Sequence, residues 1–413
     1  MSISGIKGMN DVLPDAVGVW QFLERSAREV FGTYGFAEIR TPVLEKTELF
    51  CRSIGETTDI VEKEMYTFAD KSGNSMTLRP EGTAPVMRSI IQNRLAAQDP
   101  VAKLFYIGPM FRYERPQKGR YRQFYQIGVE AIGVEDPKID AQILMMLHHF
   151  FNRIGINAVS LEINSLGCPA CRPDYRRQLI QYLEQRLEPL CSECQRRYQT
   201  NPLRVLDCKV ESCRAATTDA PAVVEHLCGE CDQHFSQVRH YLDLLKVPYT
   251  VNVRMVRGLD YYVRTTFELV TDQLGSQNAV AAGGRYDGLI ESLGGPALPG
   301  IGFAIGLERL VLMLDQDVVS TAAPELFIAA LGDAAVEQAF ILMSQLQVQG
   351  VRADMDFQGK SLKAQMRRAD KLGAVHTLII GDDELRSGQA QLKKMADGSQ
   401  TSVRLDALLD LLT

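Results

Sequence analysis

The stretch GPMFRYERPQKGRYRQFYQIGVE, residues 108–130, predicts two strands joined by a basic loop. Residues 112–122 hold five basic residues against one acidic residue, in a chain whose formal net charge is −6. Alternate side chains of a strand share a face, so each strand should present its even-numbered residues together. The residues expected on this face are Arg112, Glu114, Phe124, Gln126 and Glu130.

This set of side chains suits a nucleotide. The planar guanidinium of Arg112 fits a phosphate, Glu114 can accept a hydrogen bond from an amino group, and Phe124 can stack on a base. The alternative is a solvated hairpin with its charges turned outward. We disfavour it because the charges share a face with Phe124 and Gln126.

Around the hairpin, strands and helices follow one another without regular alternation. This order favours an α+β fold over a doubly wound sheet. Apolar periodicity predicts helices over residues 20–31 and 140–154. Strands are expected at residues 36–40, 76–78, 104–107, 111–113, 124–129, 249–256 and 265–270.

Two further regions differ in composition from this core. A Cys-, Arg- and Pro-rich, mostly helical stretch beginning at Cys168 is interpreted as an inserted module. After a break at residues 315–324, strand and helix alternate cleanly, which predicts a small three-layer α/β domain with parallel strands. Its expected elements are residues 326–331, 334–349, 351–357, 361–372 and 377–381.

Two glycine-rich segments also carry candidate functional residues. In GIGFAIGLERL, residues 300–310, spaced glycines precede Arg309 at the start of an amphipathic helix, although packing alone would explain such a pattern. In VRGLDYY, residues 256–262, Arg257 precedes two adjacent tyrosines, and AGGRYDG follows at 282–288. Structural core tyrosines are the alternative interpretation of this second segment.

Composition excludes several classes of protein. The chain has 413 residues, of which 46% are hydrophobic and 23% charged, values that are ordinary for a globular protein and exclude global disorder. The sequence shows neither a run of about 18 apolar residues nor the apolar core of a signal peptide. We therefore expect no membrane association and a cytoplasmic location.

Eight of the nine cysteines fall in the inserted module. In a reducing compartment such pairs indicate metal ligands or free thiols before disulfides. Eight thiolates could form two four-cysteine zinc sites, and reduced buried thiols are the alternative, so the choice stays open. The pairs are Cys168/Cys171, Cys191/Cys194, Cys208/Cys213 and Cys228/Cys231, three of them CxxC.

Together these segments resemble the class II aminoacyl-tRNA synthetases. The basic hairpin is similar to their motif 2, residues 302–309 to motif 3, and the helix and strand ending at Pro42 to motif 1. Four segments resemble patterns of the histidyl-tRNA synthetases in particular: KGMND at 7–11, TLRPEGT at 77–83, RGLDYY at 257–262 and GGRYDG at 283–288.

The resemblance covers the whole chain and implies its fold and activity. It implies a class II antiparallel-sheet catalytic domain over residues 1–320, with a helical insertion at about 168–240, and an anticodon-binding domain over 325–413. It implies activation of L-histidine with ATP and associated Mg²⁺, followed by transfer to the 3′ end of tRNA-His. A class II core also implies a homodimer. The family does not need zinc for activity.

The matched positions imply roles for individual residues. For ATP, Arg112 would bind the α-phosphate, Glu114 the adenine amino group, Phe124 the ring and Arg309 the γ-phosphate. Arg257 would act with Arg112 in catalysis from the other side of the α-phosphate. The histidine site would consist of Glu81, Gly82, Thr83, Arg112, Gln126, Glu130, Arg257, Tyr261 and Tyr262.

The resemblance implies tRNA contacts as well. The loop with Arg115, Gln117 and Arg120 would read the acceptor end. In the carboxyl-terminal domain, four basic residues at spacings of 3, 4 and 4 would line one helix face and could contact phosphates, with a plainly solvated face as the alternative. They are Lys360, Lys363, Arg367 and Lys371.

Two other functions share parts of this sequence pattern. A synthetase-like regulatory subunit of ATP phosphoribosyltransferase shares this core but typically lacks the carboxyl-terminal domain and has degraded histidine signatures. The present chain keeps residues 326–413 and has Arg257, Tyr261 and Tyr262. The other rival is a class II enzyme for threonine, proline or glycine, and the 257–262 signature disfavours it.

Overall fold

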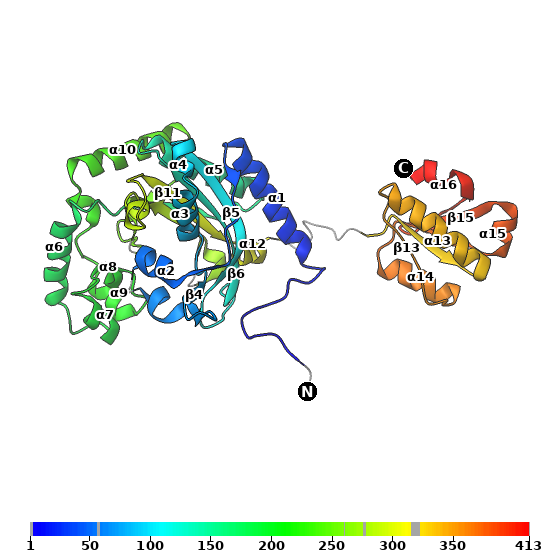
Figure 1. The fold of residues 1–413 in the computed structure, drawn as a ribbon, viewed down its shortest axis with the longest axis horizontal. Coiled ribbons are helices and arrows are strands. Elements are labelled where there is room, and N and C mark those ends of the chain that lie inside the picture. Colours follow the sequence, from blue (N-terminus) through cyan, green and yellow to red (C-terminus); the bar gives the residue numbers. More distant parts are fainter. Residues whose placement is uncertain (1–2, 56–57, 260, 276–277, 315–322, 413) are drawn as a thin grey trace. The chain divides into compact units, whose positions relative to one another are not determined.

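A computed structural model of the protein describes residues 3–55, 58–259, 261–275, 278–314 and 323–412. The chain divides into two compact units, Met1–Val318 and Val319–Thr413 (Figure 1). No helix in the described part of the chain is long and apolar enough to cross a membrane.

The larger unit is built on an 8-stranded sheet in the order β1-β5-β6-β11-β10-β9-β7-β8. The pairs from β5 across to β7 are antiparallel, whereas β1 joins β5 and β8 joins β7 in parallel. This irregular, mostly antiparallel sheet confirms the expected α+β class. The strands are β1 (Ala37–Glu38), β5 (Ala102–Phe111), β6 (Gln123–Ile132), β7 (Ser160–Ser165), β8 (Thr250–Val251), β9 (Val263–Val270), β10 (Ala279–Arg285) and β11 (Gly300–Gly306).

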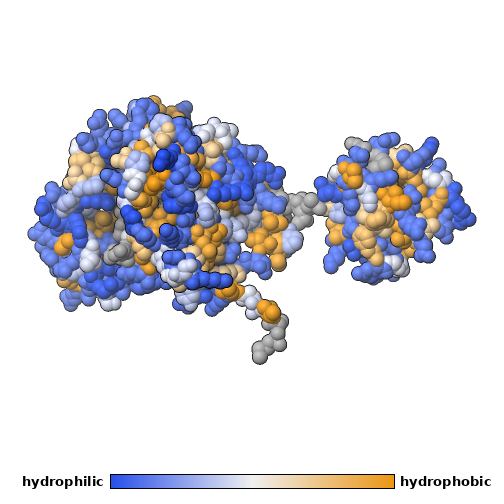
Figure 2. Space-filling view, in the orientation of Figure 1, coloured by the Kyte–Doolittle hydropathy of each residue, from blue (hydrophilic) through white to orange (hydrophobic). Residues whose placement is uncertain are grey.

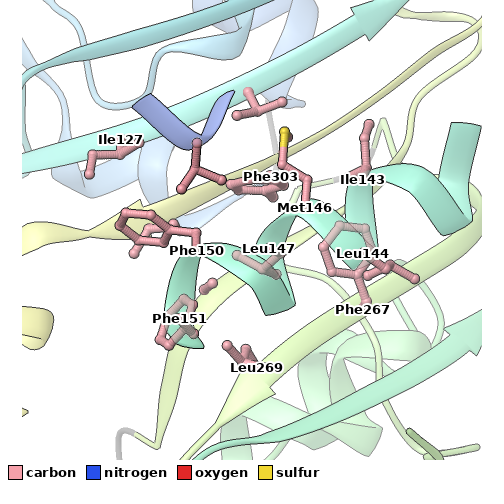
Figure 3. Close-up of a cluster of buried hydrophobic side chains, with 14 of the residues drawn as sticks. Ile127, Ile143, Leu144, Met146, Leu147, Phe150, Phe151, Phe267, Leu269 and Phe303 are labelled. Atoms are coloured by element: carbon pink, nitrogen blue, oxygen red, sulfur yellow. The ribbon is translucent and has the colours of Figure 1, made fainter. Parts of the chain in front are cut away.

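One face of this sheet is covered by long helices. Odd-numbered residues of β6, β9 and β11 point to this side, and Ile127, Phe267 and Phe303 meet the apolar side of α5 there (Figure 3). Helical spacing places Leu147 and Phe150 of α5 on that side. The covering helices are α1 (Val17–Thr33), α5 (Lys138–Arg153), α10 (Gly229–Leu244) and α12 (Leu307–Met313).

The opposite face carries shorter elements and the even-numbered side chains of the strands. A second core there packs helix α3 against residues such as Tyr106 and Ile132. A small sheet in the order β2-β4-β3 lies in the same part of the chain. The elements are β2 (Leu44–Lys46), α2 (Thr47–Ile54), η1 (Ile60–Glu64), β3 (Tyr66–Ala69), β4 (Ser75–Leu78), α3 (Thr83–Gln92), α4 (Leu95–Gln98) and α11 (Leu289–Ser292). The short turn η3 (Asp272–Leu274) after β9 instead packs Leu274 on the first core.

The inserted module is helical, as expected, and its short helices gather at one end of the larger unit (Figure 1). It has a small core of its own, in which Tyr175, Leu179 and Leu183 of its longest helix are almost fully buried. Its elements before α10 are α6 (Arg172–Glu184), α7 (Ser192–Arg197), α8 (Leu203–Leu206), α9 (Glu211–Ala216) and η2 (Val223–His226).

The smaller unit has the predicted three layers. Alternate residues of its central strand face opposite sides, with Leu326 and Ile328 packed against α13 and Phe327 against α14. The outer side of α13 leaves Phe340 and Ile341 exposed. Figure 2 shows apolar residues on the visible face of this unit. The elements are β12 (Leu326–Ala330), α13 (Asp333–Val348), β13 (Ala353–Met355), α14 (Leu362–Lys371), β14 (His376–Ile380), α15 (Asp382–Ser387), β15 (Gln389–Lys394), β16 (Gln400–Arg404), η5 (Leu405–Ala407) and α16 (Leu408–Leu412).

The structure differs from the sequence-based expectation in two of these regions, and a third prediction is left untested. The sheet of the smaller unit is only partly parallel, because β15 and β16 add an unpredicted antiparallel hairpin. The strand expected at 249–256 ends at Val251, since the Asn252 side chain accepts from the backbone N–H of Arg254 and turns the chain. The predicted linker at 315–324 falls mainly outside the described residues.

A buried ion pair joins the end of β10 to the start of α5. Arg285 and Asp140 are both fully buried, and Nη2 of Arg285 donates to Oδ2 of Asp140 at 2.7 Å. Arg285 also donates to the backbone carbonyls of Val134 and Glu135, at 3.2 and 2.8 Å. Its positive charge is thus neutralised and its N–H groups are used, which is the condition for burying a guanidinium at acceptable cost.

We expect Asp140→Ala to destabilise the larger unit by about 3–5 kcal/mol, because it removes the fully buried counter-charge of Arg285 and leaves only the partly exposed Asp287 beside it. Urea unfolding followed by tryptophan fluorescence measures this directly, since Trp20 of α1 is the chain's single tryptophan. Asp174→Ala is the control: it removes an exposed ion pair with Arg177 and should leave the transition unchanged. Equal midpoints for the two variants would contradict the expectation.

Candidate active site

A cleft of about 240 Å³ opens on the sheet face opposite α5. Strands β6, β10 and β11, the loop after β5, the start of α3 and the segment before β9 all contribute to its wall. Most residues that the sequence singled out meet here although they are far apart in the chain. Those that line the cleft are Glu81, Thr83, Arg112, Glu114, Arg120, Phe124, Gln126, Arg257, Tyr261, Tyr262 and Arg309.

The hairpin supplies one end of the cleft. The Arg112 guanidinium lies 5.3 Å from the centre of the Phe124 ring, and its Nε donates to the Pro80 carbonyl at 2.9 Å. Glu114 is buried and forms ion pairs with Arg112, at 3.9 Å, and with Arg120. Strand β5 ends at Phe111, because the Tyr113 N–H donates to the Glu64 carbonyl, so Arg112 and Glu114 follow the strand and do not belong to it.

Three arginines face one another across this end. Burial, together with the nearby charges of Arg120 and Arg112, lowers the pKa of Arg309. Arg309 is held by the carbonyls of Gly119 and Ala279. These clustered, half-buried cations favour a ligand that carries several negative charges.

The segment before β9 forms the other end. The Arg257 guanidinium lies 5.1 Å from the centre of the Tyr262 ring and forms an ion pair with Glu268. The Tyr261 ring packs on Tyr262 at 4.7 Å and edge-on against Tyr286 at 5.8 Å. Asp260 of the same signature lies outside the described residues.

Beneath the cleft lies a buried hydrogen-bond network. Oγ1 of Thr83 donates to Oε1 of Glu130 at 2.7 Å, and the Tyr286 hydroxyl donates to the other carboxylate oxygen. Burial raises the pKa of Glu130 to about 8. Burial also raises the pKa of Glu81, whose oxygens accept from the backbone N–H groups of Thr83 and Ala84 at 2.7 and 2.9 Å. The first turn of α3 is therefore fixed beside the cleft.

Two buried polar atoms in the cleft have no partner among the described residues: Oε1 of Gln126 and Nε of Arg257. Buried polar groups in folded proteins are usually hydrogen-bonded, and leaving one unpaired is costly. An acceptor and a donor left unpaired in one cleft therefore indicate ligand groups of the complementary kind.

Glycines in the sheet make room for these groups. In the register of β6 and β11, Gly302 stands opposite Glu130, and a Cβ on it would lie 2.1 Å from Glu130 Oε2. Gly82 and Gly128 flank the ring of Tyr106, so that a Cβ on either would lie within 2.2 Å of it. The glycine-rich 300–310 segment thus fits closely around side chains of the site.

Four of the sequence-predicted residues do not line the cleft. Glu130 lies behind Thr83 and Tyr286, and Gly82 lies behind the Tyr106 ring. Arg115 and Gln117 are exposed on the loop between β5 and β6. Arg120, expected beside them, instead turns into the cleft toward Glu114.

Some residues that line or support the cleft are missing from the sequence-based prediction of the site. Tyr286 stands in the GGRYDG segment, and the alternation of β10 could have identified it, because Arg285 next to it faces the opposite side. Tyr106 could have been identified in the same way from β5. Glu308 also lines the cleft and accepts from the backbone N–H of Tyr125 at 2.9 Å, and burial raises its pKa to about 7.

The cysteines form two groups outside the cleft. In each group, one ligand sulfur per residue lies within 4.8 Å of the others. Cys168, Cys171, Cys228 and Cys231 form what we call the outer cysteine cluster, at the two ends of the insertion. The inner cysteine cluster contains Cys191, Cys194, Cys208 and Cys213.

Comparison with known proteins agrees with this geometry. The histidyl-tRNA synthetase family model matches residues 8–310, and an anticodon binding domain model matches residues 325–413. The histidine–tRNA ligase of Syntrophotalea carbinolica is 67% identical over 408 residues, 99% of this chain and 97% of that protein. That of Geobacter sulfurreducens is 63% identical, over 98% of this chain and 97% of its own.

Solved structures show the same relationship. An apo histidyl-tRNA synthetase of S. aureus is 40% identical, with a TM-score of 0.84 and complete coverage of both chains. A Bacillus halodurans protein described as an ATP phosphoribosyltransferase regulatory subunit/histidyl-tRNA synthetase shares the fold, with a TM-score of 0.64 over 92% of this chain, but only 20% identity. With catalytic and anticodon-binding segments both matched, the chain belongs to the histidyl-tRNA synthetase family.

Proposed function

We propose that the cleft is the active site in which this histidine–tRNA ligase joins L-histidine to ATP, releases pyrophosphate and passes the histidyl group to the 3′ end of tRNA-His. One observation carries this proposal. Half-buried arginines at one end of the cleft lie next to a set of polar groups suited to an amino acid at the other, and two buried atoms of the second set, Gln126 Oε1 and Arg257 Nε, have no partner among the described residues.

The hairpin end would bind ATP. Phe124 would stack on adenine. Glu114 would accept a hydrogen bond from the adenine amino group once its ion pairs with Arg112 and Arg120 are loosened or broken. Arg112 would bind the α-phosphate and Arg309 the γ-phosphate. Mg²⁺ would arrive bound to the ATP phosphates, since this ion keeps several waters and is usually held by substrate phosphates with only one or two protein carboxylates.

The tyrosine-rich end would bind histidine. Imidazole donates at one nitrogen and accepts at the other, which suits the Glu130 carboxylate on one side and the Tyr262 hydroxyl on the other. The Glu130 oxygens each keep a lone pair beyond those used by Thr83 and Tyr286. The α-amino group would bind Gln126 Oε1, Glu81 and Thr83, with Gly82 and Tyr261 completing the wall.

Catalysis would rest on positioning and charge. When the histidine carboxylate attacks the α-phosphorus, negative charge grows on the phosphate oxygens, and Arg112 and Arg257 would stabilise it from two sides. The attacking carboxylate needs no base, so the protein only has to align the two substrates. An amino acid other than histidine would leave polar groups of the site unpaired, which would lower its kcat/KM by roughly 10⁴-fold in favourable cases.

Two regions are proposed to contact tRNA. Arg115 and Gln117 are exposed near the cleft and would meet the acceptor end, and Arg120 would join them after leaving Glu114. We assign catalysis to residues 1–320 and anticodon binding to 325–413. In the latter, α14 exposes Lys363, Arg367 and Lys371 while Leu362, Met366 and Ala369 pack inward, which supports a phosphate-facing surface.

Assembly and location are also proposals. We propose a homodimer, on the resemblance of the amino-terminal helix and strand to class II motif 1. The substrates of the reaction, tRNA and ATP, support action in the cytoplasm. Light scattering coupled to gel filtration would measure the assembly.

Each cysteine cluster is proposed to hold one structural Zn²⁺. Sulfur–sulfur distances of 3.5–3.9 Å in the outer and inner clusters suit a tetrahedral site, in which Zn–S bonds of about 2.3 Å place sulfurs about 3.8 Å apart. Four thiolates would leave no open position, so such sites would stabilise the insertion without taking part in the reaction.

The ligase proposal predicts pyrophosphate exchange confined to histidine among the twenty amino acids. We expect Arg257→Ala to slow this exchange by about 10²–10³-fold, because it removes a donor to the developing negative charge. Arg177→Ala, at an exposed arginine of the insertion, is the control and should keep full exchange. A folded chain with no exchange for any amino acid would refute the proposal and favour a regulatory role.

Glu130 predicts a pH dependence. With its pKa at about 8 in the free protein, Glu130 is neutral below that pH and charged above it. Since the carboxylate is the stronger acceptor for an imidazole N–H, kcat/KM for histidine should show a rising step near pH 8, above the step at about pH 6.5 that the substrate imidazole itself produces. Glu130→Gln should lower kcat/KM by about 10- to 100-fold and abolish the step near pH 8. A step near pH 8 that persists in this variant would contradict the assigned role.

The cysteine clusters predict two zinc ions per chain. Elemental analysis of protein purified without chelator should give this ratio, and Cys194→Ser should reduce it by one. Less than one zinc per chain in the unmodified protein would disprove the proposed sites.

A further inference from the structure

We propose that the outer cysteine cluster positions the histidine-binding segment 257–262, and that Arg172 is the positioning residue that connects the two. The inference rests on the proposed ligase function and on the proposed zinc sites, and goes beyond both: the metal would tune recognition of the amino acid from outside the cleft.

The outer cluster closes the insertion at its base. Cys168 and Cys171 follow β7 directly, and Cys228 and Cys231 stand at the start of α10. Sulfur atoms of the two pairs approach to 3.6 Å, between Cys171 and Cys228, and to 3.7 Å, between Cys171 and Cys231. A metal bound there would fix both ends of the insertion and the turn that contains Cys171.

Arg172 connects this turn to the cleft. It is the residue after Cys171 and the first of α6. Its Nε donates to the Leu166 carbonyl at 3.2 Å, and its Nη2 donates to the carbonyl of Tyr262. One guanidinium therefore joins the metal-binding turn to the backbone of a residue whose side chain lines the histidine end.

Backbone hydrogen bonds make this connection stiff. Leu166 N donates to the Arg264 carbonyl at 2.7 Å, and Arg264 N donates to the Gly167 carbonyl at 2.8 Å. Gly167 has a φ of +64°, and a Cβ on it would lie 3.0 Å from the Cys171 sulfur. The chain is thus packed tightly between the thiol cluster and the start of β9.

A shift of the Tyr262 backbone would reach the ligand. Tyr262 is buried, and its ring contacts both Tyr261 and the Arg257 guanidinium. In such a packed group the ring cannot adjust independently of its backbone. Loss of the Arg172 bond should therefore weaken histidine binding more than ATP binding, because the ATP end, apart from Arg257, is built from the hairpin and α12.

The inner cluster is not a suitable control. Arg204, which lies between Cys194 and Cys208 in the chain, donates to the Gly258 carbonyl at 2.6 Å, so the inner half of the insertion also contacts the segment. Arg176 is a better match. It belongs to the same helix as Arg172, is exposed, and donates to the carbonyls of Gln199 and Thr200 inside the insertion, at 2.7 and 2.9 Å.

The test measures KM for histidine and for ATP by pyrophosphate exchange in the full-length chain, with zinc content and thermal melting on the same samples. We expect R172Q to raise KM for histidine about tenfold or more, with KM for ATP and zinc content unchanged. R176Q should change neither KM. R172K keeps one donor but loses the two-pronged guanidinium, so its KM for histidine should fall between those of R172Q and the unmodified chain.

The metal is tested by C228S and by the double variant. C228S should lose one zinc and raise KM for histidine, and R172Q/C228S should be no worse than C228S alone, because both act through one connection. R172Q with unchanged KM for histidine, or with both KM values raised alike, overturns the proposal. A C228S variant that loses one zinc but keeps the original KM for histidine overturns the proposal too.

Failure of the underlying functions would be distinguishable. If the unmodified protein holds no zinc and R172Q still raises KM for histidine, the metal has no part in positioning and this proposal is overturned. Histidine-dependent exchange in the same assay would nevertheless leave the ligase function intact. Absence of exchange in the unmodified chain would instead refute the ligase function. Histidine binding would then be measured by calorimetry, and an unaltered affinity in R172Q would overturn the positioning role as well.

Discussion

The two-residue repeat of the large antiparallel sheet is the constraint on which the rest of the larger unit depends. Successive side chains must point to opposite faces, so one face can be apolar and covered by helices while the other is polar and open. Arg285 and Tyr286 show the consequence at consecutive positions. Arg285 reaches Asp140 of α5 in a fully buried ion pair, and Tyr286 reaches Glu130 beneath the cleft. Loss of register at the end of β10 would therefore disturb both the core and the site.

Placing polar groups on a buried sheet face has a cost that the structure meets in specific ways. Glu130 is surrounded by protein, and hydroxyl donors from α3 and from the residue after β10 satisfy its oxygens. Space for it comes from Gly302 on the neighbouring strand. The groups left unsatisfied, on Gln126 and Arg257, are those that a ligand would complete. These two groups are thus preorganised for a ligand, because they are already desolvated and oriented before anything binds.

The part of the fold and site that follows from local patterns was predictable from the sequence. Alternation placed Phe124, Gln126 and Glu130 on one face of β6. Helical spacing placed Lys363, Arg367 and Lys371 on one face of α14, but Lys360, predicted beside them, precedes the helix. Prediction failed where tertiary contacts decide. Tyr113 bonds to Glu64 and ends β5 early, and Arg120 turns inward because Glu114 offers a buried counter-charge. Which cysteine pairs meet depends on how the insertion folds back on itself. The β15–β16 hairpin had a local signal, the Asp397-Gly398 turn, but its polar strands lack an apolar run.

The arrangement of the insertion bears on how an active site of this kind keeps its specificity. The end of the cleft proposed to bind histidine includes the segment before β9, whose described residues belong to no strand and so lack the ladder of hydrogen bonds that fixes Gln126 or Gly302. Its backbone carbonyls are instead held by arginines of the insertion, Arg172 at Tyr262 and Arg204 at Gly258. A segment outside regular structure can hold a ring in place only if another rigid element supports it. The insertion is small and has a limited apolar core, which is the situation in which cross-linking by a metal adds most to rigidity. The cysteine clusters and the aromatic pocket are therefore parts of one mechanical unit, although no cysteine lines the cleft described here.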